Sequence, residues 1–107
     1  MTHALPPIVH NMAASRFEVQ VDGLLSICDY RRRDGVLVLP HTVVPPELQG
    51  RGIAAALVEA ALAHARAEGL RVDPVCSYVA VHLRRHPRHA DLLRATRLSA
   101  PPRPAGG

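Results

Sequence analysis

The amino-acid sequence predicts one compact domain of mixed α/β class. Apolar and polar residues alternate over residues 16–22, which is typical of a half-buried strand. Over residues 53–65 the apolar residues recur at helical spacing instead, and a short apolar run follows at residues 70–75. The chain has 107 residues, and two domains of half that length would each be too small to bury a core.

Three strands are expected to form an antiparallel meander in the first half of the domain. The first, residues 16–22, ends at the turn pair Asp22-Gly23, and residues 24–31 return as the second strand. Residues 36–44 form the third and most buried strand. Pro40 lies inside it and gives no N–H to a strand ladder, so we expect a bulge or a sheet edge at that point.

The sequence predicts one long helix, one parallel strand and one or two short helices in the second half of the domain. Gly69 ends the long helix at the position where a left-handed residue is usual. Residues 70–75 then form a strand, and the strand–helix–strand order implies parallel pairing with the third strand. Ser77 is expected to cap a second helix over residues 78–85, and residues 89–97 form one or two further turns.

Weakly patterned segments flank this domain. Residues 1–15 contain two adjacent prolines and little periodicity, so we expect a loose lead-in. The domain itself spans residues 16–98. Residues 99–107 are rich in proline and glycine and are expected to form a disordered tail.

Composition excludes several classes of protein. The chain is 48% hydrophobic and 21% charged, which excludes a largely disordered or collagen-like chain. No apolar run approaches the roughly 20 residues that cross a bilayer, so no membrane association is expected. Residues 1–10 do not resemble a secretory signal, and two cysteines are too few for a disulfide scaffold. We therefore expect a cytoplasmic protein.

The net charge of +4 is concentrated toward the end of the sequence. Residues 81–107 hold six arginines and one acidic residue. Such a segment is typical either of a solvated end or of a site for a polyanion. The chain has three aromatic residues and therefore few platforms for stacking bases, which makes a small nucleic-acid-binding protein the least favoured alternative.

The clearest chemical signal lies in residues 43–56, VVPPELQGRGIAAA. A buried strand leads through a short loop, which contains Gly50 and Gly52, into the first turn of the long helix. Glycine lets a backbone approach a ligand closely, and a helix N-terminus points free N–H groups at an anion. Arg51 adds a full positive charge. The same pattern also fits a tight turn without a ligand, and neither nucleotide-binding fingerprint is present.

Residues 49–54, QGRGIA, resemble the Q/R-x-x-G-x-G/A signature of the GNAT acetyltransferase superfamily. Residues 41–48, 74–80 and 85–87 are similar, in order and spacing, to a small single-domain branch of that superfamily. Residues 16–18 resemble its first strand, so the likeness covers residues 8 to about 94. It implies a compact GNAT-like fold and an enzyme that uses acetyl-coenzyme A as acetyl donor.

The resemblance also assigns a cofactor-binding role to two stretches of backbone. The end of the third strand would bind the pantetheine arm, and the signature loop would bind the pyrophosphate. The thioester would then lie between the third and fourth strands, near Val75 and Cys76, where ligands of open α/β sheets bind. The residues implied are Thr42, Val43, Val44, Gln49, Gly50, Arg51, Gly52, Ile53 and Ala54.

Three side chains are candidates for catalysis. Cys76 immediately precedes a predicted helix, where the pKa of a thiol can be lowered, and the resemblance implies an acetyl acceptor there. The alternative is a small packing residue, the role that we also expect for Cys28. Tyr78 would donate its hydroxyl to the leaving thiolate or pack against the cofactor. His41 is a candidate general base, with a structural role as the alternative.

No metal site is expected. His82 and His86 are spaced i, i+4 and share a helix face, but no cysteine or glutamate pattern accompanies them. Arg84, Arg85 and Arg88 nearby would repel a cation.

The sequence therefore predicts an N-acetyltransferase acting on an unidentified amine, by direct attack or through Cys76. The alternative is a non-catalytic domain that binds or senses coenzyme A. Larger relatives implied by the resemblance carry an early helical region that forms a wall beside the acceptor, and this sequence lacks it. We accordingly expect an open acceptor side and a large, even macromolecular, acceptor.

Overall fold

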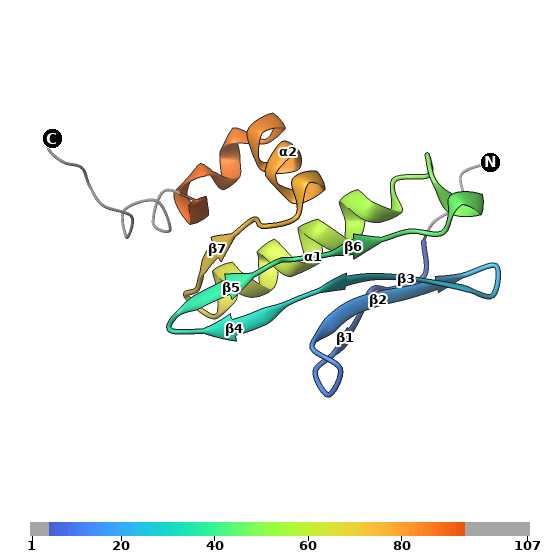
Figure 1. Cartoon of the computed structure of the whole chain (residues 1–107), viewed down its shortest axis with the longest axis horizontal. Helices are drawn as coiled ribbons and strands as arrows, with labels where there is room; N and C mark the ends of the chain where they lie inside the picture. The colour runs from blue at the N-terminus through green and yellow to red at the C-terminus, as the bar shows by residue number, and fades with distance from the viewer. Residues whose placement is uncertain (1–4, 94–107) are drawn as a thin grey trace, which may run out of the picture.

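The computed structural model describes residues 5–93, which form two small β-sheets and a long helix, α1 (Figure 1). The expected tail and residues 94–98 of the expected domain lie outside this part. The strands are β1 (Val9–Asn11), β2 (Arg16–Val21), β3 (Leu24–Asp29), β4 (Arg31–Arg33), β5 (Val36–Val38), β6 (Thr42–Val43) and β7 (Arg71–Asp73). The helices are α1 (Ile53–Ala67) and α2 (Ser77–Arg85), with 3-10 turns η1 (Pro46–Leu48) and η2 (Pro87–His89).

Two long bent strands run through both sheets. The first sheet has the order β1-β2-β3-β6 and is antiparallel throughout, and the second has the order β4-β5-β7. β3 continues into β4 and β5 continues into β6 (Figure 1). β5 pairs antiparallel with β4 and parallel with β7, which confirms the expected parallel strand after the long helix.

The third expected strand changes its neighbour at Pro40. Leu39 still belongs to the second sheet: its N–H donates to the Asp73 carbonyl at 3.0 Å, and its own carbonyl accepts from Cys76 N–H at 2.9 Å. His41 belongs to the first sheet, because its carbonyl accepts from Asp29 N–H at 2.9 Å. Pro40 has no N–H to leave unpaired at this point. The break expected there is present, and beyond it β6 pairs only with β3 among residues 5–93.

The expectation of a loose lead-in over residues 1–15 is wrong for β1. This strand pairs antiparallel with β2, with His10 opposite Phe17. The His10 ring stacks on Phe17 at a centroid distance of 4.3 Å, and its Nε2 lies 2.6 Å from the Tyr30 hydroxyl. Periodicity does not reveal β1 because the strand is short and its packing residue is a histidine.

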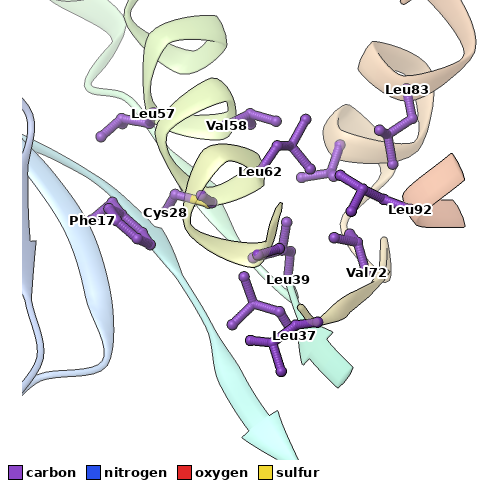
Figure 2. Close-up of a cluster of buried hydrophobic side chains, with 14 of the residues drawn as sticks. Phe17, Cys28, Leu37, Leu39, Leu57, Val58, Leu62, Val72, Leu83 and Leu92 are labelled. Atoms are coloured by element: carbon purple, nitrogen blue, oxygen red, sulfur yellow. The ribbon is translucent and has the colours of Figure 1, made fainter. Parts of the chain in front are cut away.

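One face of α1 supplies six buried residues to the core, more than any other element. The apolar residues expected at helical spacing are all buried: Ile53, Leu57, Val58, Ala61, Leu62 and Ala65. Figure 2 shows α1 between Phe17 and Cys28 on one side and Leu83 and Leu92 on the other. Gly69 has φ +68° just after the helix, as expected for a left-handed stop. No helix within residues 5–93 is long and apolar enough to cross a membrane.

The helix α2 begins one residue earlier than expected. Ser77 is its first residue and not its cap; the capping position belongs to Cys76, and no side chain makes a capping hydrogen bond. The Cys76 N–H is held by the Leu39 carbonyl, which keeps the backbone extended up to that residue. The helix ends at Arg85 before His86-Pro87, as expected, and residues 90–93 are again helical.

Glu59 on α1 holds α2 and the turn that follows it. Its carboxylate accepts hydrogen bonds from His82 Nε2 at 2.7 Å, His89 Nε2 at 3.1 Å and Arg88 Nη2 at 3.0 Å. Partial burial acts to raise the pKa of Glu59, but the hydrogen bonds from His82 and His89 and the nearby charges outweigh it and lower that pKa to about 2. His82 and His89 are buried, and the Glu59 carboxylate is the polar partner that they share.

Glu59→Gln is expected to lower the free energy of unfolding at neutral pH by roughly 1–3 kcal/mol, because an amide replaces the charged acceptor. The folded-state pKa of about 2 lies below the ordinary value of 4.5, so the contribution is complete above pH 4.5 and disappears as the pH falls toward 2. Urea unfolding over this pH range measures it. Glu47→Gln, at an exposed carboxylate without a described partner, is the control. Equal losses in both variants would contradict this role of Glu59.

Candidate functional site

A short loop joins β6 to α1, and two glycines shape its end. Gly50 has φ +85° and Gly52 has φ +81°, a left-handed conformation that other residues adopt only with strain. Gly52 occupies the capping position of α1, and its carbonyl accepts from Ala56 N–H at 3.1 Å. The N–H groups of the first helical turn have no acceptor inside the helix and point toward the loop.

A cavity of about 500 Å³ opens at this helix N-terminus. It is bounded by the end of β6, the loop, the first turn of α1 and the first turn of α2. Most of the residues expected to bind the cofactor lie around it, together with one catalytic candidate. The lining residues are Thr42, Val44, Leu48, Gln49, Gly50, Gly52, Ile53, Ala54 and Tyr78. The positive end of α1 makes one part of this cavity suited to an anion.

Gln49 fixes the loop to the strand that precedes it. Its side-chain Nε2 donates to the Val44 carbonyl at 3.1 Å. Leu48, one residue earlier, is fully buried and packs the loop onto the core. These two contacts hold residues 44–49 of the loop in place without a ligand.

A thiol and a hydroxyl lie at the β6 end of the site. Cys76 Sγ is 3.7 Å from Thr42 Oγ1, and Thr42 Oγ1 is 3.8 Å from Cys28 Sγ. Cys76 is partly exposed, whereas Cys28 is completely buried. The hydrogen bonding between strands stops between β6 and the segment that contains Cys76. The Cys76 thiol lies at this gap, next to Thr42, which lines the cavity.

Comparison with known proteins now identifies the family. A family model described as GCN5-related N-acetyltransferase matches residues 16–92. The chain belongs to this family. It is an acetyltransferase with a GNAT-like fold, and a solved GCN5-like protein from Staphylococcus aureus supports both statements. That structure superposes with a TM-score of 0.66 at 27% identity, covering 80% of this chain and 85% of the other. No curated protein matches the chain.

Three of the residues that the sequence predicts for the site point away from the cavity of this acetyltransferase. The Val43 side chain is 52% exposed, because neighbouring residues of a strand point to opposite faces and Thr42 points to the cavity. The Arg51 guanidinium pairs with the Asp22 carboxylate at 3.1 Å. His41 lies near Asp29, with 3.8 Å between Nδ1 and Oδ2, in a separate hollow.

The two cysteines of the acetyltransferase have different surroundings. Burial raises the pKa of Cys28 to about 11, and the hydrogen bond from Thr42 only partly offsets this. Cys28 therefore stays protonated near neutral pH and packs in the core, as expected. Cys76 is the accessible thiol.

Tyr78 connects the cavity to the Glu59 hydrogen bonds. It lies in the first turn of α2 and is 40% exposed. Its ring stacks with that of His82 at a centroid distance of 6.2 Å, and His82 is held by Glu59. The position of this cavity wall thus depends on a carboxylate of α1.

Sequence reasoning missed Leu48, Asp22 and Glu59. Leu48 is a lone apolar residue between two prolines and the signature loop, so no periodicity marks it. Asp22 reads as a turn residue, and Glu59 reads as a polar position on α1. Their contacts join residues far apart in sequence. Among residues 5–93, no group of three or more metal-ligating side chains is arranged to hold a metal ion.

Gly52→Ala is expected to lower the free energy of unfolding by about 1–2 kcal/mol, the cost of placing an L-residue in the left-handed region. No atom lies within 4 Å of a Cβ added there, so conformational strain and not a clash causes the loss. Gly52→Asn is the matched variant, because asparagine tolerates this conformation better. Thermal and urea unfolding measure both, and equal losses would show that φ is not the constraint.

Proposed function

We propose that this protein transfers an acetyl group from acetyl-coenzyme A to an amine. The observation that carries the proposal is the cavity that runs from the N-terminus of α1 to Thr42 and Tyr78. Its two ends differ in chemistry: free backbone N–H groups lie at one end, and a hydroxyl with a nearby thiol lies at the other. A ligand with a phosphate group and a thioester matches both ends.

In this proposal the backbone of residues 49–54 holds the pyrophosphate. The N–H groups of Gly50 and Gly52 and of the first turn of α1 supply donors, and the helix dipole adds partial positive charge. The backbone of residues 42–44 holds the pantetheine arm. Arg51 is occupied by Asp22, so its charge reaches the phosphates only if that exposed ion pair opens.

Acetyl-coenzyme A supplies the acetyl group as an activated thioester. In the direct route the neutral amine attacks the carbonyl carbon, a C–N bond forms, and the C–S bond breaks. Tyr78 donates a proton to the departing thiolate, and the backbone N–H near Val44 stabilises the oxygen. His41, the candidate base, lies in a separate hollow beside β6, so the proton that the amine loses would reach it only through water.

The second route uses Cys76. Its thiolate attacks the same carbon and takes the acetyl group, and the amine then removes that group and restores the thiol. The position of Cys76 Sγ, 3.7 Å from the cavity-lining Thr42, supports this route. We also propose a cytoplasmic location, which the two free cysteines support.

Calorimetry is expected to show acetyl-coenzyme A binding at micromolar to millimolar concentration. Ala54→Glu places a negative charge in the cavity and should weaken binding about tenfold or more, which corresponds to about 1.4 kcal/mol. Ala63→Glu adds the same charge on an exposed position of α1 and should leave binding unchanged. No binding by the unaltered protein would overturn the proposal. Binding without transfer to any amine in a broad panel would favour a coenzyme A sensor instead.

Cys76→Ala separates the two routes. Loss of turnover with retained acetyl-coenzyme A binding is expected if the acetyl group passes through sulfur, and mass spectrometry of the unaltered protein should then detect acetylated Cys76. Retained turnover would leave only the direct route. Cys28→Ala removes the buried thiol and is the control, with circular dichroism to confirm that both variants fold.

A further inference from the structure

Three polar side chains form a hydrogen-bonded row at the β6 end of the cavity, with Thr42 in the middle. The Cys76 thiol donates to Thr42 Oγ1 at a sulfur–oxygen distance of 3.7 Å, and the Thr42 hydroxyl donates to Cys28 Sγ at 3.8 Å. Thr42 also lines the cavity, so this row borders the space that a ligand would occupy. The proposed acetyl transfer uses only the backbone of Thr42 and leaves its hydroxyl without a role.

The backbone on both sides fixes this row. Thr42 on β6 is paired directly with Cys28 on β3, so the two side chains lie on the same face of the sheet. Cys76 is held from the other side, because its N–H donates to the Leu39 carbonyl at 2.9 Å. The contact between Cys76 and Thr42 therefore joins two side chains across the gap in the hydrogen bonding between strands.

Only one end of the row is able to carry a negative charge near neutral pH. Cys28 is completely buried, and burial raises the pKa of its thiol to about 11. Its sulfur therefore stays neutral and is a weak acceptor. Cys76 is partly exposed, so solvent is available to take its proton. The Thr42 hydroxyl thus has a neutral neighbour on one side and an ionisable neighbour on the other.

Loss of the Cys76 proton changes which sulfur the Thr42 hydroxyl binds. A hydroxyl has one hydrogen to donate, and a thiolate accepts it more strongly than a neutral thiol, because charge assistance roughly doubles a hydrogen bond. Ionisation also ends the donation from Cys76 to Thr42, so the hydroxyl hydrogen turns from Cys28 toward Cys76. A rotation about the Cβ–Oγ1 bond is sufficient, because the oxygen already contacts both sulfur atoms. Cys28 keeps the Asp29 carbonyl, 4.0 Å from its sulfur, as an acceptor.

We propose that Thr42 positions Cys76: its hydroxyl donates to the Cys76 thiolate, stabilises that charged form and holds the sulfur beside the cavity. A hydrogen bond to the charged form of a group favours that form. The catalytic use of this thiolate rests on the proposed acetyl transfer through sulfur, whereas the reactivity of the thiol does not. Thr42 contacts Cys76 and not the transferred group, so it acts through Cys76.

Alkylation of the protein by iodoacetamide tests the proposal without acetyl-coenzyme A. The Cys76 thiolate forms a bond to the methylene carbon of the reagent and iodide leaves, so the rate at each pH reports the thiolate present. Thr42→Val removes the hydroxyl and keeps the shape of the side chain. We expect the rate at about pH 7 to fall roughly threefold to tenfold, the equivalent of one hydrogen bond. Above about pH 10, where the thiol is ionised in both proteins, the rates should converge. Mass spectrometry identifies Cys76 as the residue modified.

Two further variants separate hydrogen bonding from packing. Thr42→Ser keeps the hydroxyl and should restore most of the rate near neutral pH. Ser26→Ala removes another buried hydroxyl, two residues from Cys28 on β3, which has no hydrogen-bond partner within residues 5–93. This control should leave the pH profile of alkylation unchanged. If circular dichroism shows that Thr42→Val does not fold, Thr42→Ala takes its place with the same expected result.

An unchanged pH profile in Thr42→Val would overturn the proposal. An equal loss of rate at every pH would also overturn it, because a change in access alone has that effect, and so would the failure of Thr42→Ser to restore the rate. Calorimetry with acetyl-coenzyme A distinguishes this proposal from the acetyl transfer on which its catalytic use rests. Absence of binding contradicts acetyl transfer and leaves the alkylation result standing, whereas binding with an unchanged pH profile contradicts only the role of Thr42.

Discussion

The change of hydrogen-bond partner at Pro40 is the constraint on which the site depends. Leu39 bonds toward β7 and the segment after it, and His41 bonds toward β3. Proline at position 40 has no N–H, so it cannot donate a ladder hydrogen bond to either sheet at the point where they diverge. The divergence separates β6 from Cys76 and leaves an open edge of backbone. The cavity at the start of α1 reaches this edge, and the separate hollow at His41 lies beside it.

The helix α1 gives this opening its two different faces. On one face the helix covers the sheet with apolar side chains, and its N-terminus lies at the cavity. Through Glu59 it also holds α2, and with it Tyr78. On the other face, no helix among residues 5–93 covers Asp29 and His41.

The sequence predicts the parts of this structure that depend on local pattern. The apolar spacing of α1, the glycines before it and the break at Pro40 are all readable from neighbouring residues, and so is most of the cavity lining. The pairing of Arg51 with Asp22 and the contacts of Glu59 are not, because each joins side chains more than twenty residues apart. Strand alternation explains why His41 lies outside the cavity. It is next to Thr42 in the sequence, but adjacent residues of an extended strand face opposite sides.

Two histidines join two aromatic residues in a cluster of rings beside β1. The rings of His10, Phe17, Tyr30 and His64 come from β1, β2, the residue between β3 and β4, and α1, and they pack together. Burial and the nearby His64 lower the pKa of His10 below its ordinary value of 6.5. The unfolded chain therefore takes up protons on His10 more readily than the folded one as the pH falls through this value. Mild acid thus reduces the contribution of His10 to stability while leaving the Glu59 carboxylate charged.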